Sequence, residues 1–85
     1  MENETVKQAV VRAVQQAFDD WAAEHPSLAA VIDRISLAET AAESLRASPE
    51  YEAALAGYHK SRSELEFLSR LVELASPIVR SLLGT

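Results

Sequence analysis

A seven-residue repeat of mostly apolar side chains between Ser48 and Leu83 constrains the fold of this chain more than any other feature. One series of the repeat is Tyr51, Tyr58, Leu65, Val72 and Val79, and a second series three residues on is Ala54, Ser61, Leu68, Ala75 and Leu82. This spacing is typical of a helix with one face packed against another helix. Ser48-Pro49 is a typical helix start, and Ser76-Pro77 interrupts the pattern, so we expect one long helix over residues 49–75 and a short one over 77–83.

Two amphipathic helices are predicted before it. The first covers residues 4–24 and ends at His25-Pro26, because the residue before proline is pushed out of the α region. The second covers residues 27–46. Its short link to the third helix predicts an antiparallel pair, in a register that places Val31 against Leu65 and Leu28 against Leu68.

The sequence therefore predicts an all-α fold with one domain over residues 1–85. We expect a small antiparallel helical bundle of three main helices, with a short C-terminal helix or helical extension after Pro77. Gly57 lies inside the long helix, where glycine is unfavourable by roughly 1 kcal/mol relative to alanine, so we expect a close backbone contact there.

Charge and composition narrow the function. The net charge is -5, which argues against a protein that follows the phosphates of nucleic acid or binds an anionic membrane. Cysteine is absent, which excludes disulfides and fits a cytoplasmic protein. No stretch of about 18 uncharged apolar residues is present to form a membrane span.

No pattern in the sequence predicts a catalytic, cofactor-binding or metal site. His59 falls in a heptad-spaced row with Glu52, Glu66 and Glu73, but neighbours in that row are about two turns apart, too far to share one ion. We interpret the row as a solvated polar stripe. Arg62 is four residues before Glu66, and we expect the two to form a helix-surface ion pair rather than a substrate site.

The C-terminal part of the chain predicts a partner. The second helix is too short to cover the segment after Arg70, and exposing its apolar side chains would forgo roughly 10–20 kcal/mol. We expect the segment either to fold back at Pro77 or to pack against another chain. The expected interface with a partner is Phe67, Leu71, Leu74, Ile78 and Leu82.

These observations favour a non-enzymatic, homo-oligomeric helical module for interaction or regulation, whose partner is a second copy of itself. An alternative is a small acidic inhibitor or antitoxin-like protein that binds a basic partner. A small all-helical enzyme is a third possibility, for which the scattered lysines and arginines provide no cluster of cations.

Overall fold

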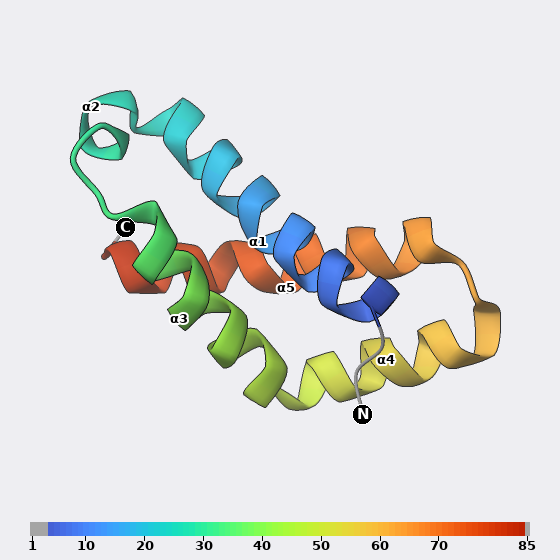
Figure 1. Cartoon of the computed structure of the whole chain (residues 1–85). Coiled ribbons are helices and arrows are strands. Elements are labelled where there is room, and N and C mark those ends of the chain that lie inside the picture. The colour runs from blue at the N-terminus through green and yellow to red at the C-terminus, as the bar shows by residue number, and fades with distance from the viewer. Residues whose placement is uncertain (1–3, 85) are drawn as a thin grey trace.

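The computed structural model describes residues 4–84, which are all-helical and contain no strand. The elements are α1 (Glu4–Glu24), α2 (Pro26–Ala29), α3 (Arg34–Ala47), α4 (Pro49–Ser61) and α5 (Glu64–Leu83). They form an elongated body of 41 × 20 × 20 Å (Figure 1). α1 has the bounds that its amphipathic pattern predicts.

The C-terminal helix α5 is the centre of the fold. It packs most extensively on α1 and also contacts α3 and α4, and in Figure 1 it crosses behind both α1 and α3. The core joins one face of α1 to one face of α5, with smaller contributions from α3 and α4. Its buried side chains are Val6, Val10, Ala13, Val14, Ala17, Phe18, Trp21, Ala41, Leu45, Tyr51, Ala54, Phe67, Leu71, Ala75 and Val79.

The second predicted helix, residues 27–46, is interrupted at residues 30–33. Asp33 is the reason, because its side chain caps α3. One carboxylate oxygen accepts from the backbone N–H of Ser36 at 3.3 Å, and the other accepts from the Ser36 hydroxyl at 2.8 Å. An aspartate that bonds nearby backbone groups competes with helix continuation, so the prediction of one uninterrupted helix was wrong.

The third predicted helix, residues 49–75, is interrupted at Arg62-Ser63. Arg62 ends α4 in the left-handed conformation, with φ 59° and ψ 17°. Ser63 then caps α5, since its hydroxyl oxygen accepts from the backbone N–H of Glu66 at 3.3 Å. The segment Ser63-Glu64-Leu65-Glu66 has the serine-to-glutamate spacing of a capping box, which marks a helix start inside a continuous heptad pattern.

Pro77 does not end a helix, contrary to the prediction, but lies within α5. The helix continues through it because the residues on both sides are held in the core: Ala75 and Val79 are buried. The Ser76 hydroxyl donates to the carbonyl of Val72 at 3.0 Å, one turn back. Tertiary packing therefore outweighs the local cost of an interior proline.

These breaks overturn the predicted pairing of two straight helices. Val31 and Leu65, which were expected to pack on each other, are 78% and 75% exposed. The contact expected at Gly57 is also missing, because a Cβ added there would meet no atom within 4 Å. Instead, α5 folds back from the Arg62-Ser63 loop and packs between the other helices.

Candidate functional site

A largely apolar hollow lies on the surface between α1 and α3, and we call it the α1–α3 groove. It consists of two adjoining hollows of about 370 Å³ each, which share Gln15 and Ala38. Its apolar lining comes from Val11, Val14 and Phe18 of α1 and from Ile35, Ala38 and Ala42 of α3. The groove forms because both helices direct their buried faces toward α5, which leaves their outer edges apart.

Large apolar side chains along this groove lie in water. Ile35 is 78% exposed and Val11 is 49% exposed, one on each wall. Before the start of α3, Val31 is also 78% exposed and Leu28 is 49% exposed. We call Ile35, Ala38 and Ala42 of α3 the α3 stripe. Their steps of three and four residues are those of a helix–helix contact face, yet the residues that α3 buries are Ala41 and Leu45.

Charged residues border the groove. Arg34 bridges its walls at the α2 end, where the guanidinium lies 2.8 Å from a carboxylate oxygen of Asp19 and 5.7 Å from the centroid of the Phe18 ring. The pair is exposed, so it orients the two helices more than it stabilises them. Glu39, Glu43 and Arg46 line the other end. The groove thus has an apolar floor and a border of both charges, which is the composition of a protein-binding surface.

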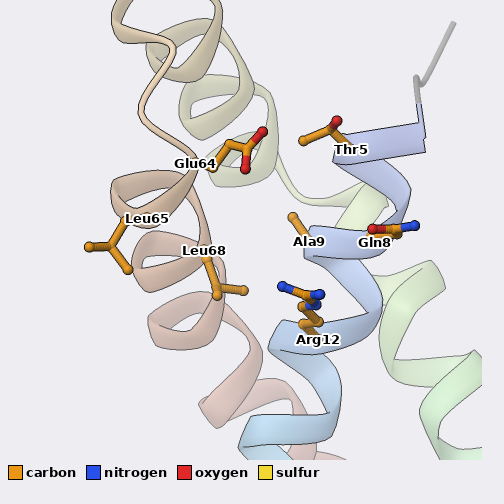
Figure 2. Close-up of a pocket in the computed structure, with 7 residues that line it drawn as sticks. All are labelled: Thr5, Gln8, Ala9, Arg12, Glu64, Leu65 and Leu68. Carbon is orange, nitrogen blue, oxygen red and sulfur yellow. The ribbon is translucent and has the colours of Figure 1, made fainter.

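A second groove of about 360 Å³ lies between α1 and the first turns of α5 (Figure 2). It is lined by Thr5, Gln8, Ala9, Arg12, Glu64, Leu65 and Leu68. In Figure 2 the Leu65 side chain points away from α1, which agrees with its exposure. Arg12 and Glu64 provide one guanidinium and one carboxylate, and the lining has no histidine or cysteine that would serve as a nucleophile or base.

The predicted partner interface divides into a buried part and an exposed part. Phe67 and Leu71 are buried in the core of the chain itself, and the Phe67 ring stacks on Tyr58 with centroids 4.7 Å apart. Leu74 and Ile78 are half-buried against the same core, whereas Leu82 remains on the surface. The segment after Arg70, which the second predicted helix was too short to cover, is covered by α1 and α3, because the break at Arg62-Ser63 turns α5 back onto them.

The histidines lie apart from any cluster of ligands. His59 is exposed beside the Tyr58 ring, and the His25 ring stacks on Trp21 with centroids 5.0 Å apart. Residues 4–84 contain no group of three histidine, cysteine or carboxylate side chains that would hold a metal ion. At the start of α3, the Ser36 hydroxyl and then the Ser36 backbone N–H lower the pKa of the Asp33 carboxyl group.

Comparison with known proteins gives no relative. The chain matches no family model, and neither a curated protein nor a solved structure is significantly similar to it. Within the described residues, no helix combines the length and apolar character needed to cross a membrane.

Sequence reasoning missed the α1–α3 groove. Ile35, which lines it, belongs to the second predicted helix, whose residues Leu28 and Val31 were assigned to the inside of a straight hairpin. The signal that would have corrected this is local: Asp33 with Ser36, and Ser63 with Glu66, have the spacing of helix caps. Helices that start at those caps cannot pair along the predicted register.

Proposed function

We propose that this protein is a non-enzymatic helical interaction module that binds a second copy of itself through the α1–α3 groove. The observation that carries the proposal is the α3 stripe, which has helix-packing spacing and whose largest side chain, Ile35, is left 78% exposed by the chain's own fold. Burying a side chain such as Ile35 contributes about 1.5–3 kcal/mol. A second copy offers an identical stripe, and a two-fold axis lets each copy cover the other.

The side-chain sizes in the stripe support an antiparallel contact between two α3 helices. If these cross near Ala38, Ile35 of one copy faces Ala42 of the other, so large residues meet small ones as close packing requires. The crossing also brings Arg34 of one copy toward Glu43 of the other. Val11 then extends the apolar contact from α1. This arrangement gives a contact that is apolar in its centre and charged at its edge.

The experiment is light scattering on the wild type and on Ile35→Asp over a range of concentrations. We expect the wild type to dimerise and Ile35→Asp to be monomeric, because a carboxylate would be buried without a partner in the contact. Ile35 is largely exposed in the single chain, so circular dichroism should show an unchanged helix content. The matched control is Ser44→Asp, which adds the same charge to an exposed position on the opposite side of α3. A wild type that is monomeric at about 0.1 mM would refute the proposal.

One observation favours a second function, that of an acidic inhibitor of a basic protein. The whole chain has a net charge of -5. Exposed carboxylates gather at two helix starts, with Glu50 and Glu52 in α4 and Glu64 and Glu66 in α5. Binding of this kind weakens steeply with salt because it depends on charge complementarity. Self-association through the α1–α3 groove is mainly apolar and should persist at high salt, so the salt dependence of complex formation separates the two functions.

A further inference from the structure

The loop between α4 and α5 holds the one non-glycine residue with positive φ among residues 4–84. Arg62 has φ 59° and ends α4, a position at which glycine is favoured because an L side chain is strained there. The loop consists of Arg62 and Ser63 and lies at one extremity of the molecule (Figure 1). Short, strained loops of this kind favour the exchange of the following element between copies.

The sequence across the loop is compatible with one straight helix. Residues 58–76 contain no glycine or proline, and Tyr58, Leu65 and Val72 keep their seven-residue spacing through the loop. Lys60 and Glu64 are four residues apart, as are Arg62 and Glu66, and opposite charges at this spacing stabilise a helix. The bend is therefore maintained mainly by the packing of α5, because the Ser63 cap only offsets the cost of positive φ at Arg62.

The site that α5 occupies is specific for α5. Phe67, Leu71, Ala75 and Val79 fill the core against α1 and α3, and no other segment of the chain carries these side chains in this order. We propose that two copies exchange α5: in each copy α4 and α5 join into one straight helix, and α5 packs against α1 and α3 of the other copy. The same residues then contact one another in the core, but these contacts connect two chains.

Residues near the loop favour the exchanged form. Leu65 is 75% exposed when the loop is bent, and it would lie where the two straight helices cross, opposite Tyr58 of the other copy. The last turn of α4 carries His59 and Lys60, whereas the first turn of α5 carries Glu64 and Glu66, so antiparallel crossing brings opposite charges together. The exchange goes beyond the proposed function, because it requires no contact through the α1–α3 groove.

Cysteine cross-linking tests the exchange directly, since the natural chain has no cysteine. Glu24 at the end of α1 and Arg80 near the end of α5 face each other at 3.8 Å between a carboxylate oxygen and a guanidinium nitrogen. Glu24→Cys chains and Arg80→Cys chains are mixed at high concentration, warmed close to the unfolding midpoint, cooled, and then treated with a flexible bis-maleimide, because the two long side chains keep their backbones too far apart for a direct disulfide. Exchange should give a cross-link between the two kinds of chain. The double variant, with both cysteines in one chain, is the positive control for the distance.

The role of the loop is tested in the same mixture with Arg62→Gly added to both chains. Glycine relieves the strain of the bend and disfavours the straight helix, so the dimer dissociation constant should rise by about tenfold for each loop, or about a hundredfold in all. Arg62→Ala is the matched control, because it removes the charge but keeps the cost of positive φ. It should exchange at least as well as the wild type.

The outcomes separate this inference from the proposed function. A cross-link between chains that is lost with Arg62→Gly and kept with Arg62→Ala supports the exchange. If the wild type dimerises but the mixed cysteine chains give no cross-link, the exchange is overturned and association through the α1–α3 groove is left intact. A wild type that is monomeric throughout overturns both. A cross-link unaffected by Arg62→Gly overturns the strained loop as the cause of exchange.

Discussion

Replacing each of the two glycines of this chain with alanine tests the backbone conformation of the structure without a steric effect on packing. A Cβ added at Gly57 or at Gly84 would meet no atom within 4 Å, so neither alanine substitution changes packing. The backbones differ, because Gly57 lies inside α4, whereas Gly84 caps α5 with φ 74°. Alanine should therefore stabilise the protein at position 57 and destabilise it at position 84.

The magnitudes follow from backbone conformation alone. Alanine is favoured over glycine inside a helix by roughly 0.5–1 kcal/mol, mainly because the unfolded chain loses less entropy. A domain of this size shifts its Tm by about 4–8 °C for each kcal/mol, so Gly57→Ala should raise the Tm by roughly 3–6 °C. Alanine with positive φ costs about 1–2 kcal/mol, so Gly84→Ala should lower the Tm by a comparable or larger amount.

The Tm of both variants is measured by circular dichroism during thermal unfolding. The protein concentration is kept low, so that the single chain dominates. A lower Tm for Gly57→Ala would refute the reasoning, because it would mean that another group approaches Gly57 closely. A repeat at high concentration extends the test. Stabilisation that is present at low concentration and absent at high concentration would locate a contact with a second copy at this part of α4.

Further substitutions test the core, the cap and the interior proline. Leu71→Ala should destabilise the chain by about 2–5 kcal/mol in urea unfolding because Leu71 is buried at the centre of α5, whereas Leu82→Ala on the surface should change stability by less than about 0.5 kcal/mol. Pro77→Ala should raise the stability by up to about 3 kcal/mol, since it restores a backbone donor inside α5. The bonds from Ser36 lower the pKa of Asp33 in the folded state, so this carboxylate stabilises the fold above its unfolded pKa of about 3.9 and loses its effect as pH falls through the lower folded pKa. Asp33→Asn keeps a capping oxygen but cannot titrate, and its unfolding midpoint should depend less on pH in that acid range.

The sequence was sufficient for the fold class and for α1. The apolar series from Val6 to Trp21 identifies both the helix and the face that it buries, because a single-sided pattern over more than about four turns allows no other regular structure. The sequence also indicated that the apolar segment after Arg70 must be covered. The helices that cover it depend on a turn that the heptad pattern does not contain.

The arrangement of the helices was mispredicted because two kinds of signal conflict. The heptad spacing through Tyr58, Leu65 and Val72 favours continuity, whereas the Ser63 cap favours a new start at Glu64. A cap contributes about 1 kcal/mol, which is close to the cost of the left-handed conformation at Arg62. The free energy gained from the cap and the free energy lost at Arg62 nearly cancel, so neither one determines the bend.

Burial of α5 therefore determines how the helices are arranged. The core contacts of Phe67 and Leu71 are much larger than the local terms at the loop, but they are equally satisfied within one chain or between two. Protein concentration and the small energy of the loop therefore control the exchange proposed above. Association through the α1–α3 groove does not exchange contacts within a chain for contacts between chains. It adds the burial of Ile35 and Val11 to a fold that is already complete. The groove contact should accordingly respond at once to dilution, whereas exchanged chains must open their cores to separate and should persist long after dilution.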